Sequence, residues 1–243
     1  MTIDRALVPS IVLAAGLAAG GLFIGNGFAR GRAADRFVTV KGTAERNVRA
    51  DLAIWPLRLV VANNDLAAAN AQIQASVDAV RQFLQRHHID PSETSLQDFS
   101  VTDAAANQFG PQQAASRYVI HETVVVRSER PDLVLAASQQ VAELVTAGVV
   151  LSSGGGYGSG GPTFTFSGLN TLKPAMIAEA TARAREAAEQ FARNSHSQVG
   201  GIREANQGVF EILPRDQAQG ITEASQILKT VRVVSTIQYF LRG

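Results

Sequence analysis

The sequence predicts an α+β protein, in which an N-terminal transmembrane helix precedes a body of mostly antiparallel sheet with helices packed on one face. Three observations predict this class. Residues 6–28 carry no charged side chain, apolar residues alternate in short runs from residue 37 onward, and three later stretches repeat apolar residues at helical spacing. Strands and helices are interleaved without the glycine-rich first turn of a regular βαβ repeat, which favours an α+β arrangement.

The first 36 residues form the predicted membrane anchor and a short linker, and residues 37–243 form the predicted α+β domain. At about 1.5 Å per residue, a helix over residues 6–28 would be roughly 34 Å long, enough to cross the hydrocarbon core of a bilayer. A cleaved signal peptide is the alternative, because Gly27 and Ala29 could form a small-residue cleavage site. The apolar run of a signal peptide is usually shorter, so the length favours an uncleaved anchor.

Strands are predicted where apolar residues alternate with polar ones or where β-branched residues gather, at residues 37–44, 53–61, 96–102, 117–128, 163–166, 202–212 and 229–241. Pro56, inside the second of these, indicates an edge position or a bulge, because proline has no N–H to donate to a neighbouring strand. The order strand, strand, helix recurs from about residues 37 and 96, which suggests two related lobes.

Two of the predicted helices follow recognisable start signals. Asn64 is a suitable N-cap for the first, whose apolar stripe consists of Leu66, Ala69, Ile73, Val77, Val80 and Leu84. The second opens at Pro131 and ends before Gly148, a suitable residue for the turn after a helix. Its predicted inward residues are Leu133, Ala137, Val141, Leu144 and Val145.

The third predicted helix, residues 172–194, carries a ridge of small side chains. Alanines recur every four residues, with a methionine one step before them: Met176, Ala180, Ala184, Ala188 and Ala192. Such a ridge lets a helix approach another surface closely. We expect the helix to lie flat on the sheet and to be closed by Gly200–Gly201.

The composition excludes several classes of function. Net charge is +1, with 22 basic and 21 acidic residues and no basic cluster of the kind that binds nucleic acid. No cysteine is present, which excludes disulfides, thiolate catalysis and cysteine-ligated zinc.

The motifs that could carry chemistry lack the context that each requires. Residues 156–161 match G-x-G-x-x-G, but Pro162 and a predicted strand follow, where a dinucleotide site needs a helix. His121 and Glu122 begin like HExxH, yet neighbours on a strand face opposite sides and cannot share a metal. We expect the other histidines, His87, His88 and His196, to lie at helix ends, the first two exposed to solvent. The sequence thus predicts no catalytic, cofactor-binding or metal-binding residue and no cofactor.

Three segments carry a family resemblance: VKGTAERNVRADLA, YVIHETVVVRS, and the A-x3-A-R-x2-A-x3-A core of the third helix. Through them, residues 37–241 resemble the SIMPL-domain family, which includes bacterial periplasmic immunogenic proteins. The first hairpin matches the family pattern at Val40, Gly42, Asp51 and Ala53. It departs from that pattern at Ala44 and Ala50, where glycine and proline are usual, and the glycine-rich residues 154–161 are also unusual.

The resemblance implies an α+β fold, a body in the periplasm, assembly into ring-like or cage-like homo-oligomers, and a loose link to envelope stress tolerance. Arg30, Arg32 and Arg36 after the apolar span would instead favour a cytoplasmic body under the positive-inside rule. The resemblance outweighs that count, so we expect a single-pass inner-membrane protein with its soluble domain in the periplasm.

The expected function is that of a non-enzymatic, self-assembling envelope protein with a scaffold or stress-related role. Its expected partners are further copies of the chain, the lipid bilayer through residues 6–28, and an envelope protein whose identity is open; no nucleic-acid partner is expected. The main alternative is a periplasmic module that binds a small ligand or a partner protein. A third hypothesis is an enzyme that acts through His121 or Glu122.

Overall fold

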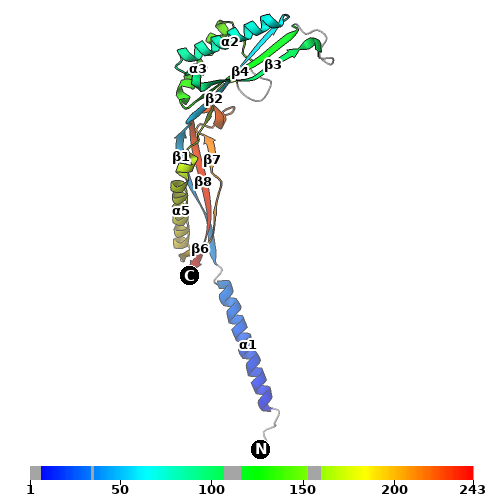
Figure 1. Ribbon diagram of the computed structural model, residues 1–243. Coiled ribbons are helices and arrows are strands. Elements are labelled where there is room, and N and C mark those ends of the chain that lie inside the picture. Colours follow the sequence, from blue (N-terminus) through cyan, green and yellow to red (C-terminus); the bar gives the residue numbers. More distant parts are fainter. Residues whose placement is uncertain (1–6, 34–35, 107–115, 153–159, 243) are drawn as a thin grey trace, which may run out of the picture. The chain divides into compact units, whose positions relative to one another are not determined.

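The computed structural model describes residues 7–33, 36–106, 116–152 and 160–242 (Figure 1). The chain divides into two units, each made of separate stretches of sequence. The first consists of Met1–Ala44, Pro174–Phe210 and Arg232–Gly243, and the second of Glu45–Lys173 and Glu211–Val231. The repeated strand–strand–helix order suggested consecutive lobes, but both units combine early and late parts of the chain.

Helix α1 (Leu7–Ala33) forms where the uncharged run predicted a helix. Its large apolar side chains at Leu13, Leu17, Leu22, Phe23 and Ile24 are exposed. Within the described part of the chain, no helix combines the length and the hydropathy that a membrane crossing requires. The transmembrane role of residues 6–28 therefore stays a prediction.

The first sheet has the strand order β1–β8–β6, and β7 also pairs with β8. Its strands are β1 (Phe37–Arg49), β6 (Gln198–Gln207), β7 (Glu211–Pro214) and β8 (Leu228–Arg242). β6 and β8 are antiparallel, with register shifts near Ile202. Along β8 buried and half-buried residues alternate, as expected for a strand with one face covered.

Helix α5 (Leu169–Asn194) is the long helix that carries the alanine ridge. The buried residues of α5 are those of the predicted ridge: Met176, Ala180, Ala184, Ala188 and Ala192. Ala184 and Ala188 share a core cluster with Ile237 and Tyr239 of β8. The prediction that the helix lies on the sheet is confirmed.

Gly42 of β1 shows how close this contact is. A Cβ atom placed on Gly42 would lie 1.9 Å from the carbonyl oxygen of Ala180 and 2.5 Å from the backbone nitrogen of Ala184. Both atoms belong to the helix backbone, so no side chain can move aside to make room. The alanine ridge and Gly42 together allow backbone-to-backbone contact between α5 and β1.

The second sheet has the strand order β3–β4–β2–β5, and its neighbouring strands are antiparallel. Its strands are β2 (Leu52–Asn63), β3 (Thr94–Asp103), β4 (Tyr118–Ser128) and β5 (Thr163–Thr165). Helix α2 (Leu66–Arg86) packs on one face, where it buries the predicted stripe from Ala69 to Leu84. Trp55 is 1% exposed and meets Phe83 of α2 edge to face, with 6.4 Å between ring centroids.

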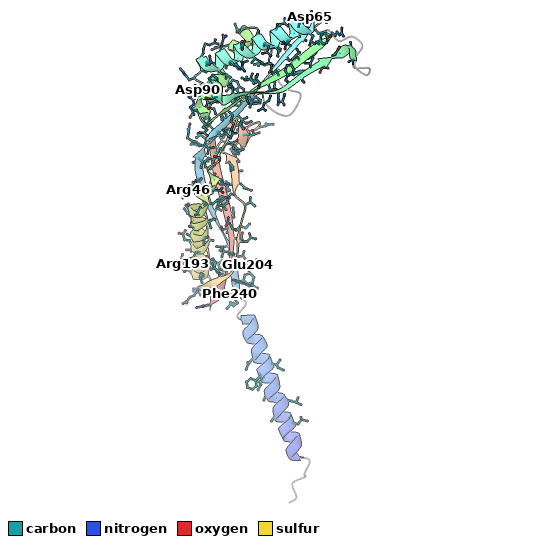
Figure 2. The ribbon with its side chains drawn as sticks, viewed as in Figure 1. Arg46, Asp65, Asp90, Arg193, Glu204 and Phe240 are labelled. Atoms are coloured by element: carbon teal, nitrogen blue, oxygen red, sulfur yellow. The ribbon has the colours of Figure 1, made fainter. Side chains whose placement is uncertain are left out.

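The start of α2 differs from the prediction by one residue. Asp65, labelled in Figure 2, is the N-cap, and its carboxylate accepts a hydrogen bond from the Ala68 N–H at 2.9 Å. Asn64 instead accepts a hydrogen bond from the Arg117 N–H at the start of β4. Leu66, placed in the apolar stripe by the sequence, is 45% exposed because it precedes the first turn that faces the sheet.

The single helix predicted after Pro131 consists of two pieces, α3 (Pro131–Gln139) and α4 (Ala142–Thr146). Val134, Ala137 and Leu144 join the core of the second unit, whereas the predicted inward residue Val145 is 62% exposed. Gly148 has a positive φ of 84°, which confirms its place in the turn after the helix.

Asp51 connects the first hairpin to the segment before α5. Its two carboxylate oxygens each lie 3.0 Å from the Ser167 N–H, and one also accepts the Ser167 hydroxyl at 2.9 Å. The Asp51 N–H donates to the Thr165 carbonyl oxygen at 3.0 Å. The aspartate that the resemblance singled out therefore has a structural role.

The end of α5 also differs from the prediction. The helix ends at Asn194 and is followed by a turn in which His196 has a positive φ of 52°. Gly200 and Gly201, predicted to close the helix, lie inside β6. Gly200 is there because the backbone and side chain of Phe240 approach within about 3 Å of where its Cβ would be.

Candidate functional site

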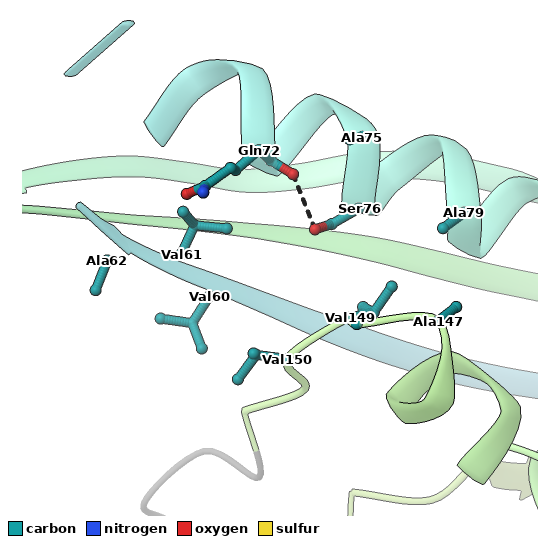
Figure 3. Close-up of a pocket in the computed structure, with 11 residues that line it drawn as sticks. Val60, Val61, Ala62, Gln72, Ala75, Ser76, Ala79, Ala147, Val149 and Val150 are labelled. Atoms are coloured by element: carbon teal, nitrogen blue, oxygen red, sulfur yellow. Dashed lines mark hydrogen bonds between the residues drawn. The ribbon is translucent and has the colours of Figure 1, made fainter. Parts of the chain in front are cut away.

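An apolar groove of about 550 Å³ lies in the second unit, between α2 and the residues that follow α4 (Figure 3). Every residue that lines it is uncharged: Val60, Val61, Ala62, Gln72, Ala75, Ser76, Ala79, Ala147, Gly148, Val149 and Val150. The small side chains of Ala75 and Ala79 leave the space open on the helix side. Its volume is in the range of ligand-binding pockets.

The groove runs beside β2 where that strand loses its second neighbour. β5 pairs with β2 only from Leu52 to Ile54, and further along a single bridge joins Leu59 to Leu151. The Val60 N–H donates to the Val150 carbonyl oxygen at 3.2 Å. Because strand residues alternate in direction, the N–H and C=O of Ala62 point to this same side.

The same alternation explains Pro56. Pro56 lies four residues before Val60, an even spacing, so its nitrogen is on the same side of β2 as the Val60 N–H. On that side it faces the gap between β5 and the Leu151 bridge. The pairing of β2 with β4 continues through Pro56 and Val125 without a register shift. The predicted bulge is therefore absent at this point of the sheet, and Pro56 occupies a local edge within an otherwise interior strand.

The opposite edge of the sheet is strand β3, which pairs with β4 and with no other described strand. Three large apolar side chains are exposed on it, at Leu96, Phe99 and Val101, with exposed fractions of 42%, 56% and 44%. A bulge interrupts the ladder between Gln97 and Ser100, and Asp98 in it has a positive φ of 56°. The bulge limits regular pairing on this edge to short segments.

A cluster of charged side chains lies at a separate pocket of about 540 Å³. Arg130 donates to Asp90 at 3.0 Å and to Glu93 at 2.5 Å, and Glu93 also accepts the Ser128 hydroxyl at 2.6 Å. Burial raises the pKa of Glu93, but the hydrogen bonds from Ser128 and Arg130 outweigh it, so the pKa lies below the ordinary value. These contacts join the turn after α2 to the end of β4, which is a structural task.

The structure separates His121 from Glu122, as the strand pattern predicted. His121 is exposed, whereas Glu122 is 5% exposed and lies on the face that α2 covers. Glu122 stands opposite the β3 bulge, and its Oε2 atom accepts no hydrogen bond from the described residues. The two side chains therefore do not form one site.

The other histidines are placed as follows. His88 is exposed, but His87, expected in solvent, stacks on Phe83 with 4.5 Å between ring centroids, and its Nε2 lies 3.8 Å from Glu143. The C-cap position of His87 turns its ring back onto the helix, which the sequence pattern did not indicate. His196 is exposed beside Ser195, whose hydroxyl bonds to Ser197 and to helix carbonyl oxygens.

Two stretches of the chain fall outside the described residues near these elements. Residues 153–159, which hold most of the glycine-rich motif, and residues 107–115 between β3 and β4 are not described. After the motif the chain enters strand β5, which is the order expected of a hairpin and not of a dinucleotide site.

The groove is the feature that sequence reasoning missed. Its walls come from the consecutive elements β2 and α2 and from residues 147–150 much later in the chain, and none of these stretches departs from an ordinary apolar pattern. The one available signal was Gly148 with the valines before Leu151, and the sequence predicted Gly148 only as the turn after a helix.

Comparison with known proteins identifies the family. No curated protein matches the chain. A family model described as SIMPL, protein of unknown function (DUF541), matches residues 38–238, which is most of the chain and includes both sheets. The chain therefore belongs to the SIMPL family.

Proposed function

We propose that this protein is a non-enzymatic envelope scaffold that assembles with further copies of itself. One observation carries the proposal: among the described strands β3 pairs with β4 alone, and Leu96, Phe99 and Val101 are exposed along it. Unpaired strand edges with apolar side chains favour pairing with another chain, and closed rings remove such edges. The ring-like assembly implied by the family resemblance supports the same reading.

Light scattering of the full-length protein in mild detergent tests this proposal. We expect an oligomer for the wild type and a smaller species for Phe99→Asp, because a charge on the edge opposes burial. Val209→Asp is the matched control, since Val209 is 82% exposed outside this sheet. A wild-type monomer over the whole concentration range would exclude self-assembly, and equal effects of the two variants would exclude the β3 edge.

The proposal places the protein in the inner membrane, with residues 37–243 in the periplasm. The uncharged residues 6–28 and the exposed apolar side chains of α1 support an anchor. Alkaline extraction of membranes should leave the protein in the pellet, and protease added to spheroplasts should degrade residues 37–243. Release by alkali would argue for a cleaved leader, and protection from the protease would argue for a cytoplasmic body.

A second candidate function is the binding of a small apolar ligand, which the groove beside β2 favours. Ala75 is exposed on the wall of the groove, so Ala75→Phe should fill it without disturbing the core. A ligand that raises the melting temperature of the wild type but not of Ala75→Phe would support this function. A panel of aliphatic and aromatic compounds that shifts neither protein would count against it.

A further inference from the structure

We infer that the β3 edge of one copy docks in the groove beside β2 of the next copy, head to tail. This inference rests on the proposed self-assembly and names the two surfaces that meet. Both surfaces belong to the second unit and to the same sheet, whose strand order places β3 at one edge and the groove on the other side of β2. One edge presents protruding apolar side chains, and the other presents a concave apolar surface.

The backbone of the two edges is complementary. Since the N–H of Val60 points to Val150, the backbone N–H and C=O groups of the neighbouring residues Leu59 and Val61 point to β4. Val61 pairs with Ile120, so the backbone groups of Ile120 point to β2 and those of the next residue, His121, point to β3. His121 pairs with Ser100, so the N–H and C=O of Val101 lie on the free side of β3. Val101 of one copy and Ala62 of the next can therefore exchange hydrogen bonds as one added strand pair.

Charge also favours this contact. All the residues that line the groove are uncharged, and so are Ser100, Val101 and Thr102 of β3. Asp103 ends the strand and is already paired with Arg117, at 3.3 Å. Asp98, which precedes Phe99 in the bulge and is exposed, has to stay in solvent at the rim of the contact; Ser100, Val101 and Thr102 then dock without bringing a charge into the groove.

The side chain that enters the groove is that of Phe99 at the bulge. It is the most exposed of the three apolar side chains on β3, and the bulge places it beside the segment that pairs. Val150, 60% exposed at the rim of the groove, provides an apolar contact for it. Because the β3 edge of one copy meets the groove of another, a pair of copies still has one free β3 edge and one free groove. Further copies can add at both, and the assembly closes into a ring when the rotation between copies allows it.

Cysteine cross-linking of the full-length protein in mild detergent tests the arrangement, and the natural chain contains no cysteine that could interfere. Val101→Cys and Ala62→Cys are prepared separately, mixed and oxidised. Strand pairing would bring their Cα atoms to about 5 Å, within the span of a disulfide. We expect a covalent dimer in the mixture and none in either variant alone. Val209→Cys mixed with Ala62→Cys is the control and should stay uncross-linked.

Each outcome has a defined meaning. A covalent dimer formed by Val101→Cys alone would show β3-to-β3 pairing and overturn the head-to-tail arrangement. An oligomer by light scattering without the mixed dimer would overturn this interface but leave self-assembly intact, whereas a monomer would remove both. As a second measure, Phe99→Ser should weaken assembly about tenfold or more, as expected for loss of a buried phenylalanine, and unchanged assembly would overturn the role of the groove.

Discussion

Replacing Gly42 by alanine should destabilise the first unit strongly, although the change adds one methyl group. The new Cβ would lie 1.9 Å from the Ala180 carbonyl oxygen and 2.5 Å from the Ala184 nitrogen, far inside contact distance. Overpacking typically costs about 1–3 kcal/mol, and the upper end applies here because both obstacles are helix backbone. For a chain of this size, about 3 kcal/mol lowers the melting temperature by about 6–12 °C.

Thermal unfolding followed by circular dichroism measures this effect on the full-length protein. Gly201→Ala is the matched control, because it is an exposed strand glycine with no atom within 4 Å of its added Cβ. That control should stabilise the protein by about 0.4–1 kcal/mol, because alanine lowers the conformational entropy of the unfolded chain. Equal melting temperatures for the two variants would refute the close approach of α5 to β1.

Three further predictions concern the ridge, the first hairpin and acid stability. Ala184→Leu should cost about 1–3 kcal/mol in thermal unfolding, whereas Ala187→Leu on the exposed side of α5 should melt like wild type; similar melting of both would place the ridge in solvent. Asp51→Ala should cost about 1–3 kcal/mol by urea unfolding, since the Ser167 N–H and hydroxyl lose a charged acceptor. The lowered pKa of Glu93 means that its contribution to stability is full above the unfolded value of 4.5 and is lost as pH falls through the folded value. Glu93→Gln should remove that part of the acid dependence in melting curves at stepwise lower pH, and an unchanged acid profile would contradict the assignment.

Local periodicity predicted the elements of the fold well. The alanine ridge of α5, the stripe of α2 and the alternation of β8 each repeat within one segment, so burial followed directly from spacing. The errors lie where two segments compete for one residue. Asn64 has the chemistry of an N-cap, but its side chain is used by the Arg117 N–H, which comes from another strand. Gly200 resembles a helix terminator, yet Phe240 requires a glycine there.

The groove could not be predicted from the sequence, because it depends on the lack of a neighbouring strand along part of β2. The groove exists since β5 covers β2 only as far as Ile54 and the Leu151 bridge covers it only near Leu59. Neither limit is encoded in the residues of the groove. The exposure of Phe99 is likewise a result of the bulge and the edge position of β3, whereas its sequence alone resembles that of an ordinary half-buried strand.

The order of strands in the first sheet also determines when the first unit can fold. β8 comes later in the chain than β1 and β6, yet it lies between them and pairs with both. Before β8 is available, neither β1 nor β6 has its neighbour, and α5 lacks Ile237 and Tyr239, the part of its packing surface that β8 supplies. Pairing of such distant segments is slow because a long loop must close first. In a chain synthesised from its N-terminus, the first sheet would therefore stay incomplete until its last strand is made, whereas most of the second unit, Glu45–Lys173, is available earlier.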